Sequence, residues 1–105
     1  MKVSLIIHDT FIVLRADAEA FRLFRATSEQ LVGSKLIDLI HAPELKGLAL
    51  LRMQIARMRE PDSLPDIDYL FRRFDGSMFY GRVNTRRLET PGEWESTIEW
   101  LYEYS

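Results

Sequence analysis

The sequence of 105 residues contains no cysteine. This absence excludes disulfide bonds, thiolate metal sites and cysteine nucleophiles together. It is compatible with the cytosol, and we expect a cytoplasmic protein. Histidine is scarce as well, since only His8 and His41 are present. A mononuclear metal site would need further His or Cys ligands, so we expect no metal.

An excess of charge of either sign is also missing. The chain has 14 basic and 16 acidic residues, and its arginines are interleaved with acids. No basic field is available to release counterions from a phosphate backbone, so we expect no nucleic-acid partner. The longest apolar run near the start, Val3 to Ile7, is too short for a signal peptide or a membrane span, and we expect no membrane insertion.

Catalytic motifs are absent too. The sequence has no Gly-rich phosphate loop, nucleophile elbow or metalloprotease helix. The acids Glu44, Glu60, Asp62, Asp66 and Asp68 fall at predicted helix ends, in a loop or at a strand edge, where charged side chains are usually solvated. We therefore expect no enzymatic activity.

What is present indicates a single domain over residues 1–105. Hydrophobic residues make up 47% of the chain, which is typical of a globular protein and not of a disordered one. Folding at this length buries about 60–70% of the surface of the unfolded chain, so we expect one core with at most one small pocket.

The first half of the chain reads as a hairpin followed by helices. Val3 to Ile7 and Phe11 to Arg15 are rich in β-formers and flank a polar turn. Asp17 is placed to cap a short helix, and Ser28 resembles the start of a capping box. The spacing predicts a long helix from Pro43 to Arg59. We expect one apolar stripe of this helix to face the core, namely Leu45, Leu48, Leu51, Ile55 and Met58.

Three strands are predicted in the second half, at Ile67 to Phe74, Met78 to Leu88 and Trp94 to Tyr104. Asp75 and Gly76 between the first two of them are a strong hairpin signal. The last strand alternates with period two, which is typical of an antiparallel sheet with one covered face. One face is expected to carry Trp94, Ser96, Ile98, Trp100, Tyr102 and Tyr104, with Leu101 as the exception to the alternation.

This order of elements, together with three motifs, resembles the PAS domain family. The motifs are Ser28 to Gly33, Leu36 to Glu44, and the hairpin from Tyr69 to Ser77. The resemblance implies an α+β fold, a five-stranded antiparallel sheet with helices packed across one face. It also implies sensing and not catalysis.

The resemblance further implies that no cofactor is bound. Photosensory members that form a flavin adduct or hold a covalent chromophore need a cysteine, and the Asn/Gln set that binds flavin is not visible. Haem-binding members ligate iron through a histidine on the long helix, and none occurs there. His41 corresponds to the histidine of a His-Pro-Glu-Asp turn in the family, which implies a hydrogen bond at the helix start.

Ligand-binding members hold a small molecule between the long helix and the sheet. The corresponding pocket residues here would be Leu48, Leu51, Ile55, Tyr69, Phe71, Phe79, Val83, Ile98 and Trp100. The same large side chains can instead fill the core, because apolar stripes are mostly core.

The opposite face of the second hairpin is also apolar. Leu70, Phe74, Met78 and Tyr80 alternate out of register with the inward set. Contiguous exposed apolar surface usually marks an interface, so we expect a homodimer or a flanking output domain to cover it.

The leading hypothesis is a PAS-type sensory and interaction module of a signal-transduction protein. A histidine kinase, a cyclic-dinucleotide enzyme or a transcription regulator could carry it. One alternative is a small cone-shaped α+β enzyme of the isomerase kind, which would need an acid facing inward. Another is a dimerisation module that binds no ligand.

Overall fold

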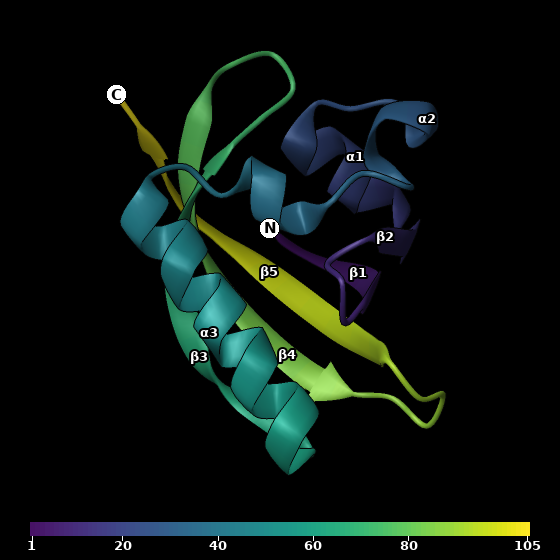
Figure 1. The fold of residues 1–105 in the computed structure, drawn as a ribbon. Helices are drawn as coiled ribbons and strands as arrows, with labels where there is room; N and C mark the ends of the chain where they lie inside the picture. Colours follow the sequence, from purple (N-terminus) through teal and green to yellow (C-terminus); the bar gives the residue numbers. More distant parts are fainter.

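Five antiparallel strands form one sheet in the order β2-β1-β5-β4-β3 in the computed structural model, which describes residues 1–105 (Figure 1). The first and last strands of the chain, β1 and β5, are therefore neighbours. Helices α1 and α2 lie beside β1 and β2, and α3 runs along β3 and β4 (Figure 1). The elements are β1 (Lys2–His8), β2 (Val13–Ala16), α1 (Ala18–Phe24), α2 (Ser28–Leu31), the 3-10 turn η1 (Leu36–Leu39), α3 (Pro43–Arg59), β3 (Ser63–Arg72), β4 (Met78–Arg87) and β5 (Glu93–Tyr104).

The two short helices begin at side-chain caps. Asp17 precedes α1, and its Oδ1 accepts from the backbone N–H of Ala20 at 2.8 Å. Before α2 the capping residue is Thr27 and not the predicted Ser28. Gln30 stands three residues after Thr27 and closes the capping box through its side chain, so the spacing selects the threonine.

Helix α3 turns a different face toward the sheet from the one that its large apolar side chains predict. Leu48, Leu51 and Ile55 are 40, 53 and 41% exposed, so the expectation that they face the core is wrong. The buried residues of α3 are Ala49, Met53 and Ala56. Small side chains let the helix lie close to the sheet, which the bulkier stripe would prevent.

The start of α3 carries no side-chain cap. Ala42 precedes the helix at φ +83° and ψ +129°, a conformation that L-residues rarely adopt. The side chain of His41 makes no hydrogen bond to the helix start; instead its backbone N–H donates to the carbonyl of Leu70 at 2.7 Å. The link between η1 and α3 is thus fixed by the backbone of β3.

A β-bulge changes the faces of the last strand. The pairing of β4 with β5 shifts between Tyr80 and Gly81, so that Tyr80 pairs with Tyr102 and Gly81 with Trp100. Leu101 is the extra residue. Because of it, Tyr102 and Tyr104 contact Tyr80 on the outer face and do not share the inward face of Trp94 and Ile98, contrary to the alternation in the sequence.

The core is centred on three phenylalanines from α1, β3 and β4. The rings of Phe24, Phe71 and Phe79 lie 5.4 to 5.6 Å apart and are fully buried. Gly81 completes this packing, because a Cβ atom there would lie 2.9 Å from Cγ2 of Ile98. The interior under α1 is therefore filled.

Candidate functional site

A small cavity lies between α3 and the sheet, and its volume is about 30 Å³. This is room for about one water molecule. Its lining is mostly apolar and comes from β1, η1, α3, β3, β4 and β5, with Met53 and Ala49 on the helix side and Tyr69, Phe71 and Val83 on the sheet side. No cluster of three His, Asp or Glu side chains is placed to hold a metal ion.

Two hydroxyl groups line the cavity on the sheet side. Thr85 on β4 and Ser96 on β5 are buried partners in the sheet, and their hydroxyl oxygens lie 3.1 Å apart in a hydrogen bond. One hydroxyl donates to the other, so one hydrogen of the pair is left to donate elsewhere. The cavity thus combines apolar walls with a pair of hydroxyl groups that can anchor a polar atom.

Tyr69 and Arg52 complete the polar part of the lining. Burial raises the pKa of the Tyr69 hydroxyl above its ordinary value, and the nearby Arg52 charge opposes that rise. The Arg52 guanidinium is held at the start of β3, where Nη2 donates to the carbonyl of Pro65 at 2.7 Å. Tyr69 therefore stays a neutral hydrogen-bonding group at any ordinary pH.

The residues that the sequence placed at this site fall into three groups. Tyr69, Phe71 and Val83 line the cavity. Phe79 and Ile98 are fully buried in the adjoining core, and Trp100 is half-buried at its edge. The remaining three do not reach the cavity, because they point to solvent from α3: Leu48, Leu51 and Ile55.

Sequence reasoning did not place several lining residues in the pocket, among them Met53, Thr85 and Ser96, although the alternation of the last strand put Ser96 on the inward face. Thr85 and Ser96 stand in inward positions of their strands, and a small polar residue there is the signal that could have found them. Met53 follows Ala49 at the i+4 spacing of a second, smaller stripe, which the larger leucines of α3 obscured.

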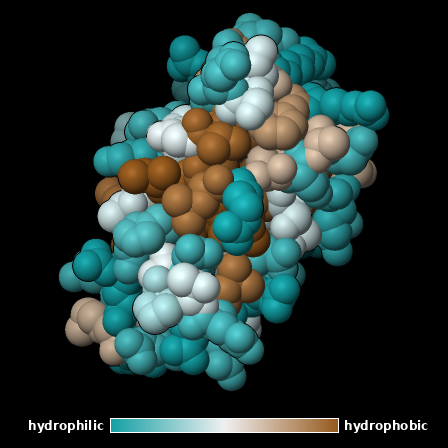
Figure 2. All heavy atoms as spheres, turned by 90° about the vertical axis from the view of Figure 1, so that its right-hand side faces the viewer, coloured by the Kyte–Doolittle hydropathy of each residue, from teal (hydrophilic) through white to brown (hydrophobic).

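The outer face of the sheet also differs from expectation in its details. Leu70 is only 7% exposed, so it is not available as contact surface, whereas Phe74 is 37% exposed. Met78 and Tyr80 are half-buried, and the exposed tyrosines Tyr102 and Tyr104 join them across the bulge. Figure 2 shows a further apolar patch with a hydrophilic margin, on the face that forms the right-hand side of Figure 1.

A buried arginine joins α1, the loop between β3 and β4, and the end of β5 on the inner side of the sheet. The Arg73 side chain is 5% exposed, lies over the Phe79 ring and donates from Nε to the carbonyl of Leu23 at 2.6 Å. Glu103 accepts two hydrogen bonds from the same guanidinium and one from Nε1 of Trp100. The Arg73 hydrogen bonds hold the pKa of Glu103 at about 2, although partial burial opposes this shift.

No protein-family model matches the sequence, and no curated protein does. Solved structures match over nearly the full chain. A PAS domain of the Cronobacter turicensis RpfR quorum-sensing receptor, in complex with C12:0, has a TM-score of 0.78 at 9% identity and covers 95% of this chain and 93% of its own.

The fold is that of a PAS domain. The PAS domain of a LuxR-family transcriptional regulator from Burkholderia thailandensis, in complex with ethanol, matches with a TM-score of 0.74 at 17% identity, covering 95% of this chain and 88% of its own. A PAS domain from a two-component sensor histidine kinase matches with a TM-score of 0.70 at 18% identity, covering 98% of this chain and 85% of its own. The predicted fold class is thereby confirmed.

None of the helices in this PAS fold has both the length and the apolar composition needed to cross a membrane.

Proposed function

We propose that residues 1–105 act as a single, non-catalytic sensory and interaction domain in a cytoplasmic signal-transduction protein. The output partner would be a histidine kinase, a cyclic-dinucleotide enzyme or a transcription regulator. The likeness to PAS domains of a sensor kinase, a quorum-sensing receptor and a LuxR-family regulator supports this assignment.

The observation that carries a sensory role is the cavity between α3 and the sheet. Its apolar walls and the Thr85–Ser96 hydroxyl pair suit a short apolar molecule with one hydroxyl or carbonyl oxygen. PAS domains of the same fold have been solved with ethanol and with C12:0, which supports ligands of this chemistry.

The cavity must enlarge to admit such a molecule, since about 30 Å³ holds only one water. Met53 is the side chain best suited to move, because methionine is unbranched and flexible. Rotation of Met53 would displace α3, and a ligand that favours the displaced position would shift the population of the two states. That shift is the signal that the output partner would detect.

A titration with 1-butanol tests this function. We expect saturable NMR shifts at the backbone amides of Met53, Thr85 and Ser96. Met53→Ala enlarges the cavity and should tighten binding at least about tenfold, whereas Thr85→Val with Ser96→Ala removes the polar anchor and should weaken it by a similar factor. Leu51→Ala, at an exposed position of the same helix, serves as the control and should change nothing.

A second candidate function is supported by the same small volume. A core that is nearly filled suits an interaction module that binds no ligand and signals through a partner alone. Failure of 1-butanol to shift these resonances in both the wild type and Met53→Ala would favour this module over the sensor. The isomerase alternative has no support, because no Asp or Glu lines the cavity.

A further inference from the structure

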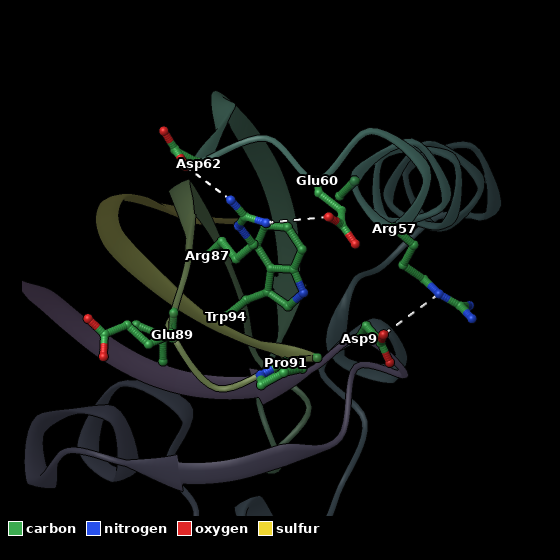
Figure 3. A pocket seen from close by; sticks show the side chains of 11 residues that line it. Asp9, Arg57, Glu60, Asp62, Arg87, Glu89, Pro91 and Trp94 are labelled. Carbon is green, nitrogen blue, oxygen red and sulfur yellow. Dashed lines mark hydrogen bonds and ion pairs between the residues drawn. The ribbon is translucent and has the colours of Figure 1, made fainter.

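A second and larger cavity lies at the end of the sheet where α3 stops (Figure 3). Its volume is about 650 Å³, within the range of small-molecule sites. The turn between β1 and β2, the end of α3, and the loop between β4 and β5 surround it. It shares no lining residue with the cavity under α3, so the two sites are separate.

The floor of this cavity presents an unpaired donor. Trp94 on β5 is 97% buried, being 3% exposed, and its indole N–H makes no hydrogen bond within the protein. Every fully buried side-chain nitrogen and oxygen does have a partner, so Nε1 of Trp94 is not sealed in the core and must open to the cavity that the residue lines. Figure 3 shows the nitrogen edge of the indole on the side of Glu60 and Asp9.

The other tryptophan, Trp100, has the hydrogen-bond acceptor within the protein that Trp94 lacks. Nε1 of Trp100 donates to a carboxylate oxygen of Glu103 at 2.6 Å. A buried indole N–H usually has such a partner, because leaving it unpaired costs free energy. Because Nε1 of Trp94 opens to the cavity, water can accept from it there, and an acceptor on a ligand would take the place of that water.

The walls of the cavity carry more negative than positive charge. The lining residues include four carboxylates, of Asp9, Glu60, Asp62 and Glu89, and two guanidinium groups, of Arg57 and Arg87, which gives a formal charge of −2. The Glu89 carboxylate points away from the other charged groups (Figure 3). The carbonyl end of α3 points to the same place and adds partial negative charge. A simple anion would therefore be repelled here, in spite of the donor on Trp94.

The ion pairs across the cavity are long, and the closest side-chain contact of Asp9 is made outside the cavity, from Oδ1 to Nδ1 of His8 at 3.0 Å. The distance from Arg57 Nε to Asp9 Oδ2 is 3.7 Å and that from Arg87 Nη1 to Glu60 Oε2 is 3.8 Å, both longer than a hydrogen bond. Only the contact of Arg87 with Asp62, at 3.2 Å, is a hydrogen bond. A single bound molecule could therefore contact both the indole N–H of Trp94 and the carboxylates of the cavity wall.

We propose that this cavity binds a small zwitterion of the free amino acid class. Its carboxylate would accept from Nε1 of Trp94 and from Arg87, and its ammonium group would lie against Asp9 and Glu60. The carboxylate of a zwitterion satisfies the indole donor, and its ammonium group means that no net negative charge is added to the cavity. This binding does not depend on occupancy of the cavity under α3.

The test is an NMR titration of the ¹⁵N-labelled protein with L-alanine, propionate and ethylammonium in parallel. The chain has two tryptophans, so the indole region holds two signals, and Trp100 is an internal control. We expect L-alanine to shift the Trp94 indole signal saturably, with half-saturation below about 10 mM, and to leave the Trp100 signal unchanged. Propionate and ethylammonium each lack one charged group and should bind at least about tenfold more weakly.

Two variants examine the two halves of the site by calorimetry. Trp94→Phe keeps the apolar floor but removes the N–H, and Asp9→Asn removes one carboxylate without disturbing the core. Each should weaken L-alanine binding at least about tenfold, while Arg82→Gln on the outer sheet face should leave it unchanged. Equal binding of propionate, unsaturable shifts, or equal shifts at both tryptophans would overturn the proposal. Asp9→Asn keeps the test valid if Trp94→Phe does not fold.

Discussion

Arg73 and Glu103 join the loop between β3 and β4 to the end of β5 through two hydrogen bonds of 2.5 and 2.7 Å. The arginine is buried and the glutamate is 45% exposed. The geometry is bidentate, which is the strong form of an ion pair. Removing the Glu103 carboxylate would leave the buried Arg73 charge without its ionic partner. An unpaired buried charge lowers the free energy of unfolding.

This pair predicts a pH dependence of stability. The Arg73 hydrogen bonds lower the folded-state pKa of Glu103 to about 2 from its ordinary value of 4.5. The stabilisation is therefore fully present above pH 4.5 and is lost as the pH falls toward 2. Solvent screening of the half-exposed carboxylate limits the loss to about 1 kcal/mol. In Glu103→Gln the free energy of unfolding, measured by urea denaturation, should fall less steeply over this pH range; an unchanged slope contradicts the prediction.

Gly81→Ala is expected to destabilise the protein by about 1 to 3 kcal/mol. The new Cβ would lie 2.9 Å from Ile98 and 3.1 to 3.2 Å from the Phe79 and Phe71 rings, so the core must shift. Gly47→Ala is the matched control, because nothing lies within 4 Å of its Cβ position and it stands in α3. That control should stabilise by about 0.5 to 1 kcal/mol. The check is the shift of the denaturant midpoint relative to the wild type. If both variants shift the midpoint by the same amount in the same direction, the overpacking argument is wrong.

Ala42→Gly is expected to stabilise the protein by about 1 kcal/mol. The backbone of Ala42 is held at φ +83°, which glycine adopts without strain, and the relief exceeds the added entropy of the unfolded chain. Ala49→Gly, in the interior of α3, should destabilise by about 1 kcal/mol or more. Thermal unfolding of the two variants measures both effects, and a lower midpoint for Ala42→Gly would show that the strain is absent.

We predict that the protein self-associates through the outer face of the sheet. The structure identifies exposed residues of this face at which the prediction can be tested. Tyr80 and Tyr102 have ring centroids 4.9 Å apart, and Tyr102 is 56% exposed. Tyr80→Glu with Tyr102→Glu should convert a dimer to a monomer in sedimentation, because charge at this apolar surface opposes burial. Leu70 is unsuitable for such a test, since it is buried and its replacement would damage the fold.

The control for the sedimentation experiment is a variant with the same charges on a different apolar surface, the exposed side of α3. Leu48→Glu with Leu51→Glu places the same charge on the exposed side of α3. We expect this variant to associate as the wild type does. Loss of the dimer in the α3 variant alone would move the interface from the sheet to the helix.

The strands and the existence of α3 could be predicted from the sequence, whereas the order of the strands in the sheet and the orientation of α3 could not. Periodicity shows that residues share a stripe but does not show which stripe meets the sheet. In α3 two stripes compete, and the smaller one, Ala49, Met53 and Ala56, wins because it permits close approach. The composition of the candidate cavity depends on that choice, which is why Leu48, Leu51 and Ile55 were misplaced.

The end of β5 shows a second limit of sequence patterns. Alternation identifies the two faces of a strand only while the register is unbroken. One extra residue at Leu101 exchanges the faces, so Glu103 points to Arg73 and the last two tyrosines point outward. Leu101 was visible as an irregularity in the pattern, but its position alone does not distinguish an exposed leucine from a bulge.

The pairing of β1 with β5 has a consequence for the order of folding. Before β5 is synthesised, β1 can pair only with β2, and a two-stranded hairpin is marginally stable in water. Seven residue pairs, from Lys2 with Glu99 to His8 with Glu93, close the sheet across almost the whole chain. Such distant contacts are slow to form because a long loop must close first. We therefore expect the sheet to reach its folded state only when both ends of the domain are present, in one cooperative step.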